Sequence, residues 1–192
     1  VCHVFLNGNK LPQRMKDKFV IAELGFGTGL NFLSTLWQWR HKKKRGKFFY
    51  TSFEAFPMRP EDMVKAQNEF AELSNIQREF SSVWNKLLEK GELHGKDYNL
   101  QLILGDARHT IKNVKIKADC WFLDGFSPSK NPELWEKELL ENVYRCTAKN
   151  GTLSTYSAAG IVRKNLNSVG FEVQRIKGFG RKRHMTTAIK KS

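Results

Sequence analysis

Short apolar runs alternate with stretches of helical periodicity along the chain. The run 19–24 (FVIAEL) ends at a glycine-rich turn, and apolar residues then recur at helical spacing over 30–37. The alternation continues and predicts further strands at 48–53, 100–104, 118–123, 151–156, 171–176 and 185–189, with helices within 57–96, 134–144 and 161–169. Strands that alternate with helices indicate βαβ units, in which a mostly parallel sheet carries helices on both faces.

The last two predicted strands are separated by only about eight residues, too few for the helical crossover that parallel neighbours require. We therefore expect an antiparallel hairpin. A seven-stranded α/β sheet with this ending resembles the class I S-adenosylmethionine-dependent methyltransferase fold, which is Rossmann-like. Residues 1–18 are expected to form an N-terminal extension, with a short strand at Val4–Leu6 and a loop, before a methyltransferase domain at 19–192 that contains a helical insertion at 57–96.

Composition restricts the class of protein. The 192 residues are enough for one domain, and no apolar run approaches the roughly 20 residues that span a bilayer. Three widely spaced cysteines and five scattered histidines match neither a disulfide framework nor a zinc site, so we expect no metal, no membrane partner and a cytoplasmic setting. A net charge of +14 exceeds what solubility requires and favours a nucleic acid as partner.

The turn after the first strand carries the strongest local signal. Glycines at positions 25, 27 and 29 follow a predicted strand and open a predicted helix, so the backbone can approach a ligand closely there. The third glycine comes one residue too early for a dinucleotide fingerprint, and Glu23 would repel a pyrophosphate. Its carboxylate instead suits a ligand with an ammonium group and no phosphate, such as S-adenosylmethionine. The alternative is a glycine-rich turn that holds no ligand.

Carboxylates follow three of the later predicted strands. Glu54 ends the second strand, where it can accept hydrogen bonds from both hydroxyls of a ribose. Asp106 follows the third strand, beside an adenine amino group, as the N-cap of a short helix, or as both. Asp124 follows the fourth strand and begins a loop with two prolines, where it faces a substrate or only caps its own loop. The carboxyl ends of parallel strands share one edge, so all three are expected near the glycine turn.

Three segments resemble one family. Residues 23–33 (ELGFGTGLNFL), 122–135 (FLDGFSPSKNPELW) and 177–185 (KGFGRKRHM) are similar to the methyltransferase domain of the tRNA 5-methylaminomethyl-2-thiouridine biosynthesis (MnmC) family. Better-known members are fused to an FAD-dependent oxidase, which nothing in this sequence encodes, so the chain resembles a stand-alone version or a trimmed domain. A separate oxidase partner has no support in the residues. The resemblance implies methylation of the aminomethyl group at carbon 5 of the wobble uridine of tRNA, with S-adenosylmethionine as donor.

The resemblance also implies roles for individual residues. Asp124 would hold or accept the proton of the attacking amine. The residues implied to bind the donor are Glu23, Gly25, Phe26, Gly27, Gly29, Asn31, Glu54, Asp106, Ala107 and Asp124. Those implied to bind the anticodon stem-loop of tRNA are Phe126, Lys130, Tyr156, Arg163, Arg181, Lys182 and Arg183.

Other readings stay open. The basic run 41–47 precedes the second strand, at the amino ends of the strands, and we interpret it as a solvated helix end. A small-molecule amine N-methyltransferase or an aminopropyl transferase shares the fold, but it would have little use for the net charge. A catalytically silent RNA-binding module has no need of the four acids at 23, 54, 106 and 124, and binding of S-adenosylhomocysteine would separate it from an enzyme.

Overall fold

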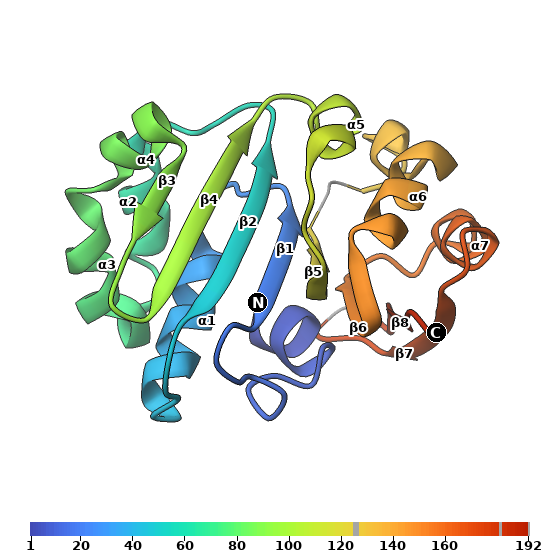
Figure 1. Cartoon of the computed structure of the whole chain (residues 1–192), viewed down its shortest axis with the longest axis horizontal. Helices are drawn as coiled ribbons and strands as arrows, with labels where there is room; N and C mark the ends of the chain where they lie inside the picture. The colour runs from blue at the N-terminus through green and yellow to red at the C-terminus, as the bar shows by residue number, and fades with distance from the viewer. Residues whose placement is uncertain (125–126, 181, 192) are drawn as a thin grey trace.

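A single eight-stranded sheet forms the centre of the molecule (Figure 1). The structure is a computed structural model that describes residues 1–124, 127–180 and 182–191. The strands lie in the order β3-β4-β2-β1-β5-β6-β8-β7. Their bounds are β1 (Val20–Leu24), β2 (Phe48–Glu54), β3 (Glu92–His94), β4 (Tyr98–Leu104), β5 (Ala118–Leu123), β6 (Thr147–Thr155), β7 (Glu172–Lys177) and β8 (His184–Ile189).

Helices cover both faces of this sheet. They are α1 (Leu30–His41), α2 (Pro60–Gln67), α3 (Ser74–Ser81), α4 (Trp84–Lys90), α5 (Ala107–Thr110), α6 (Lys137–Arg145) and α7 (Gly160–Ser168), with short helical turns η1 (Cys2–Asn7), η2 (Ala71–Leu73), η3 (Ile111–Asn113) and η4 (Pro132–Trp135). No helix among the described residues combines the length and the apolar character needed to cross a membrane.

Two hydrophobic cores follow from the alternation of side chains along the strands. Cys120 and Phe122 of β5 belong to the core shared with α1, α3 and α4, whereas Trp121 and Leu123 belong to the core shared with α6 and α7. Successive strand residues point to opposite faces, so a strand buried on both faces is apolar throughout. The continuous apolar runs of the sequence therefore gave the parallel strands correctly.

The expected strand at Val4–Leu6 is wrong: residues 2–7 form the π-helical turn η1. Phe5 and Leu6 are consecutive, and both are buried in the same core as α1. A strand would send them to opposite faces, whereas one helical turn places both against the core. Asn9, itself fully buried, fixes the turn, because its amide donates to the carbonyl of Phe5 and to Ser154 Oγ.

The sheet has one strand more than the sequence predicted. β3 lies inside the segment 57–96 that was expected to be helical, and it pairs antiparallel with β4 through Leu93 and Leu100. Three residues of alternating polarity are too few for the period of a strand to stand out in sequence. The rest of the segment is helical, as predicted, and divided into α2, η2, α3 and α4.

The predicted hairpin at the end of the chain is confirmed. β8 pairs antiparallel with both β6 and β7, so β8 lies between them and β7 runs parallel to β6. The turn that joins β7 to β8 therefore lies at the carboxyl ends of the parallel strands. This is the edge where the glycine turn and the strand-end acids also lie.

Candidate active site

The glycine turn between β1 and α1 has the backbone that its sequence predicts. Gly25, Gly27 and Gly29 have φ values of +87°, +52° and +74°, which side chains with a Cβ rarely adopt. A Cβ on Gly29 would press on the rings of Phe26 and Trp84 at 3.2 Å, so this glycine also permits packing beneath the turn. A Cβ on Gly27 would meet nothing within 4 Å, so the turn is open on that side.

Glu54 joins the end of β2 to this turn. Its Oε2 accepts a hydrogen bond from the backbone N–H of Gly27 at 2.9 Å, and its Oε1 accepts one from the N–H of Phe56 at 2.8 Å. Each carboxylate oxygen has two lone pairs, so both oxygens can accept a further donor from a ligand. The carboxylate is thus held in place while keeping free capacity for hydrogen bonds.

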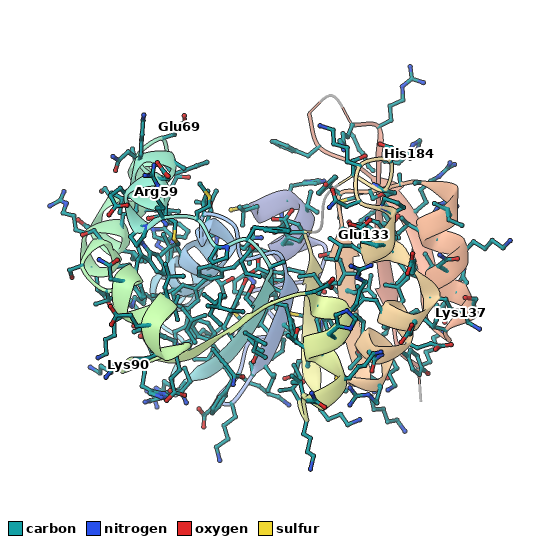
Figure 2. The ribbon with its side chains drawn as sticks, turned by 90° about the horizontal axis from the view of Figure 1, so that it is seen from above. Arg59, Glu69, Lys90, Glu133, Lys137 and His184 are labelled. Carbon is teal, nitrogen blue, oxygen red and sulfur yellow. The ribbon has the colours of Figure 1, made fainter. Side chains whose placement is uncertain are left out.

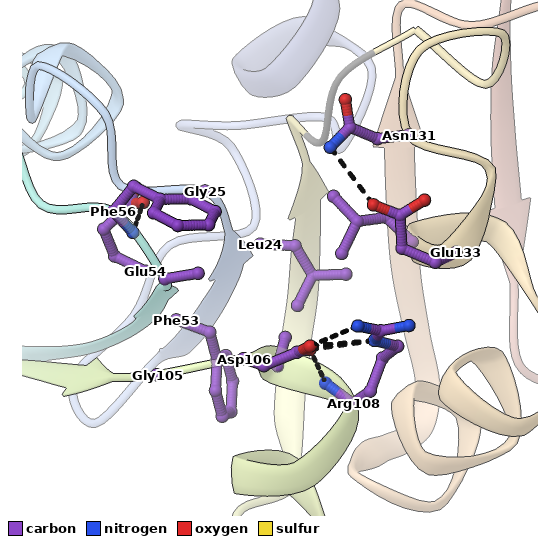
Figure 3. A pocket seen from close by; sticks show the side chains of 13 residues that line it. Leu24, Gly25, Phe53, Glu54, Phe56, Gly105, Asp106, Arg108, Asn131 and Glu133 are labelled. Atoms are coloured by element: carbon purple, nitrogen blue, oxygen red, sulfur yellow. Dashed lines mark hydrogen bonds and ion pairs between the residues drawn. The ribbon is translucent and has the colours of Figure 1, made fainter.

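Asp106 follows β4 and is the N-cap of α5, since its Oδ1 accepts from the N–H of Arg108 at 2.9 Å. The helix-cap alternative raised by the sequence is therefore confirmed. The guanidinium of Arg108 also pairs with this carboxylate, through Nε at 2.9 Å and through Nη2 (Figure 3). These hydrogen bonds lower the pKa of Asp106, so it is a carboxylate at neutral pH.

Two clefts meet at the carboxyl edge of the sheet. The larger, of about 390 Å³, includes Leu24, Phe53, Ala107 and Leu134 among its lining residues and has Asp106 and Arg108 at one end (Figure 3). The smaller, of about 260 Å³, is lined by the glycine turn, Asn31 and Asp124 among others. Gly25 and Glu54 line both clefts. The two are therefore adjoining parts of one site with Glu54 at the junction.

A chain of hydrogen bonds leads from the core to the smaller cleft. The Nδ2 group of Asn31 donates to Glu23 Oε1 and to Asp124 Oδ2, both at 2.7 Å. Glu23 Oε2 accepts a second hydrogen bond from Ser52 Oγ, also at 2.7 Å. Glu23 is fully buried and lines neither cleft. Asn31, rather than Glu23, therefore presents polar atoms to a ligand, and Glu23 fixes the orientation of Asn31.

Burial perturbs both carboxyl groups of this chain. Desolvation raises the pKa of Glu23 to about 8, against the opposing effect of the hydrogen bonds from Ser52 and Asn31. Desolvation also raises the pKa of Asp124 to about 6, and the hydrogen bond from Asn31 opposes this. At neutral pH, Glu23 is mostly protonated and Asp124 mostly ionised. Of these two groups, only Asp124 therefore presents its charge to the smaller cleft, and its pKa lies near neutrality.

The Glu23→Gln variant is expected to show a weaker pH dependence of stability than the wild type. Because the folded state raises the pKa of Glu23 from 4.5 to about 8, the unfolded state loses this proton first as the pH rises. The free energy of unfolding of the wild type should thus fall between pH 4.5 and about pH 8, a contribution that glutamine removes. Urea unfolding across this range measures it, with the exposed Glu69→Gln as control. Equal slopes in wild type and Glu23→Gln would contradict the assignment.

The residues expected to bind RNA are only partly brought together. Tyr156 is half-buried; desolvation, and then the nearby charge of Asp124, raise its pKa. The ammonium of Lys182 lies over its ring, 4.3 Å from the centroid. Figure 2 looks onto this edge, with His184 of the β7–β8 hairpin on one side and Arg59 and Glu69 of the helical insertion on the other.

Of the other expected RNA-binding residues, Arg183 follows Lys182 directly, whereas Lys130 and Arg163 belong to other segments of the chain. Lys130 and Arg183 are exposed, and Arg163 lies on α7, half-buried. Phe126 and Arg181 are outside the described residues, so the structure says nothing of these two predictions. No group of three or more metal-ligating side chains occurs in the described part of the chain.

Two contributors to the site were missed in the sequence. Ser52 pairs in register with Glu23 across β1 and β2, so its side chain reaches the buried carboxyl. The parallel register would have found it, but register is not visible in one sequence. Arg108 follows Asp106 by two residues, so it lies in the first turn of the short helix that Asp106 caps, and its position is visible in the sequence.

Comparison with known proteins places this geometry in context. A family model described as S-adenosyl-L-methionine-dependent methyltransferase matches residues 68–191. The tRNA 5-methylaminomethyl-2-thiouridine biosynthesis bifunctional protein MnmC of Leptospira interrogans is 41% identical over 191 residues, covering 95% of this chain and 30% of that protein. The protein of the same name from Azoarcus sp. is 40% identical over 189 residues, with the same coverage. The chain thus spans about a third of the length of these curated relatives.

A solved structure agrees with these matches. MNMC2 from Aquifex aeolicus is 32% identical, with a TM-score of 0.75, over 96% of this chain and 58% of that one. The similarity therefore extends over nearly all of this chain.

Proposed function

The chain belongs to the S-adenosyl-L-methionine-dependent methyltransferase family, and we propose that it methylates the aminomethyl nitrogen at carbon 5 of the wobble uridine of tRNA. The observation that carries the proposal is Asp124, a mostly buried carboxylate in the wall of the smaller cleft, held by Asn31 beside the glycine turn. The names of the relatives, which concern 5-methylaminomethyl-2-thiouridine in tRNA, supply the substrate. Such a substrate implies a cytoplasmic enzyme.

The residues present fit the donor. The larger cleft offers apolar walls for an adenine and Glu54 at the junction for two ribose hydroxyls. In the smaller cleft, the open side of the glycine turn leaves room for the methionine part. The buried Oδ1 of Asn31 has no hydrogen-bond donor among the described residues, which suits a ligand that brings N–H groups, as an ammonium does. When bound, S-adenosylmethionine supplies an activated methyl group on its sulfonium. The rest of the donor leaves as a neutral thioether.

Asp106 and Arg108 close the far end of the larger cleft. The Asp106 carboxylate is occupied by α5 and by the guanidinium, but its oxygens retain lone pairs for an adenine amino group. Arg108 offers a planar cation beside the same position, and such a group also stacks on aromatic rings. We therefore assign both residues to the adenine end of the site.

Asp124 prepares the attacking amine. A primary amine is protonated at neutral pH and has no free lone pair until it loses a proton. An ionised carboxylate in a partly desolvated wall attracts the ammonium, aligns it, and accepts or relays that proton. Asn31 keeps the carboxylate in one orientation, because its other N–H bond is anchored to the buried Glu23. In the transfer, the new N–C bond forms as the S–C bond breaks, and no further acid is needed.

The β7–β8 turn and the loop after β5 would hold the RNA. Lys182, Arg183 and Lys130 lie at the carboxyl edge, where cations can contact the phosphates of the anticodon stem. Tyr156, close to Asp124, can stack on the target base.

Methyl transfer from labelled S-adenosylmethionine to tRNA that lacks the modification tests this function. We expect label in 5-methylaminomethyl uridine at the wobble position, identified by nucleoside analysis, and none in tRNA that already carries it. Donor binding without labelled tRNA would favour a small-molecule amine as substrate. Absence of donor binding would reject the catalytic assignment altogether.

A further inference from the structure

The fold gathers a group of lysines and arginines without ion pairs at the amino ends of the strands, opposite the clefts. The loop 42–47 leads into β2, Lys96 precedes β4, and Lys18 precedes β1. Parallel strands bring these three segments to one edge, the lower edge in Figure 1. We call this surface the basic edge and define it by Lys18, Lys42, Lys43, Lys44, Arg45, Lys47 and Lys96.

Contacts between the loops confirm that the basic edge is one surface. The backbone N–H of Lys18 donates to the carbonyl of Lys47 at 2.7 Å, which ties the approach to β1 to the approach to β2. A hollow of about 690 Å³ is lined by Arg40, Lys44, Arg45, Gly46, Lys47, Lys96 and Asp97. A groove of this kind can receive a chain of anionic groups, whereas isolated lysines on a convex face cannot hold one in place.

Local acids neutralise little of this charge. Arg40, on the last turn of α1, pairs with Glu79 and Asp97 at 2.6 and 2.7 Å. The carboxylate of Asp17 accepts the backbone N–H of Lys47. Within the described part of the chain, none of the seven cations of the basic edge forms an ion pair. These cations lie on three adjoining loops, and an anionic partner would relieve the repulsion between those closer than a Debye length of about 10 Å.

The loop begins with the turn that ends α1. Lys43 has a φ of +48° and Gly46 a φ of +79°, so the loop turns sharply twice within six residues. The left-handed Lys43 ends α1 in a Schellman motif, because the N–H of Lys43 donates to the carbonyl of Arg40 and the N–H of Lys44 to that of Trp39. As a solvated helix end, the run 41–47 would need neither the cations of the other two loops nor the hollow that it lines together with Lys96.

We infer that the basic edge binds the phosphate backbone of RNA, at a second surface separate from the catalytic clefts. The inference goes beyond the proposed function and rests on it only in choosing RNA among polyanions. Anionic membranes are the other common partner of such surfaces, but membrane binding usually adds inserted apolar side chains. None of the five large apolar side chains exposed among the described residues, Phe49, Phe56, Leu104, Ile161 and Phe179, lines the hollow.

Charge reversal tests the surface. The triple variant Lys43→Glu, Arg45→Glu, Lys96→Glu changes three exposed side chains from two of the loops. We expect the slope of log Kd against log salt for full-length tRNA to decrease by about two to three, since each lost phosphate contact removes about 0.9. The matched control Lys65→Glu, Lys86→Glu, Lys90→Glu changes the same charge on exposed positions of α2 and α4 and should keep the wild-type slope.

Different results would contradict the inference about the basic edge and the proposed function. Equal slopes for the triple variant and its control would overturn the inference. The inference would also be overturned if the wild type bound vesicles that contain phosphatidylserine and the triple variant lost this binding while its binding to tRNA stayed unchanged. Calorimetric binding of S-adenosylhomocysteine reports whether the triple variant is folded. If the glutamate variant does not fold, the triple variant with glutamine at positions 43, 45 and 96 is used in its place. Failure of the proposed function would appear separately, as absence of labelled tRNA with the wild-type enzyme.

Discussion

Asp124→Asn is expected to reduce turnover on tRNA by about 10²–10⁴-fold while the affinity for S-adenosylhomocysteine changes by no more than about threefold. Asparagine keeps the shape of the side chain but can neither attract the ammonium by charge nor accept its proton. The donor contacts at Glu54 and the glycine turn are unaffected, because they lie on other elements. Single-turnover methylation and calorimetry measure the two effects separately.

The pH dependence of the methylation rate is a second measurement on the same variant. The wild-type rate should rise with pH through about 6, as Asp124 loses its proton, and this limb should be absent from Asp124→Asn. The matched control is Asp62→Asn, an isosteric change at an exposed ion pair with Arg59 on the helical insertion, which should behave as wild type. Full turnover in Asp124→Asn would exclude the aspartate as proton acceptor.

The second large effect is expected at Glu54. Glu54→Gln should weaken binding of S-adenosylhomocysteine by roughly 10- to 1,000-fold, since each hydrogen bond from a ribose hydroxyl to a charged acceptor contributes about 1.5–3 kcal/mol. The amide of glutamine would also point N–H toward N–H at Gly27 or Phe56, so the variant loosens the junction of the two clefts. Isothermal calorimetry gives the dissociation constant directly.

The effect at Glu54 is compared with that of an exposed glutamate. Glu69→Gln makes the same chemical change on an exposed residue of the insertion and should leave the affinity unchanged. Urea unfolding distinguishes loss of ligand contacts from loss of the fold. A change of less than about threefold, in a folded Glu54→Gln protein, would remove the carboxylate from the ribose site.

The sequence predicted those parts of the molecule that depend on local periodicity. The short connection identified the hairpin, and the apolar runs identified seven strands, most clearly β1, β2 and β5, which are buried on both faces along most of their length. Glu54, Asp106 and Asp124 were expected at one edge since parallel strands end together, and all three line the clefts. The rule that parallel strands end at the same edge was enough to predict the positions of these three acids.

What sequence could not show depends on contacts between distant segments. Glu23 precedes the first glycine by two residues, yet its burial is set by Ser52 and Asn31, which reach it from β2 and α1. The strand β3 exists because it finds an edge at β4, not because its three residues prefer the conformation. The basic edge likewise joins segments that are 24 residues (Lys18 to Lys42) and 49 residues (Lys47 to Lys96) apart along the chain. The sequence alone does not show which of its charged loops lie on the same edge of the sheet.

The position of β8 has a consequence for how the protein is made. Among the described residues, β7 pairs with no strand other than β8, and β8 is the later of the two in the chain. During synthesis, β7 leaves the ribosome with no neighbour, while β1, β2, β4, β5 and β6 can already pair. The hairpin that carries Lys182 is therefore added to the sheet last. The turn assigned to RNA is thus synthesised after every residue that lines the two clefts.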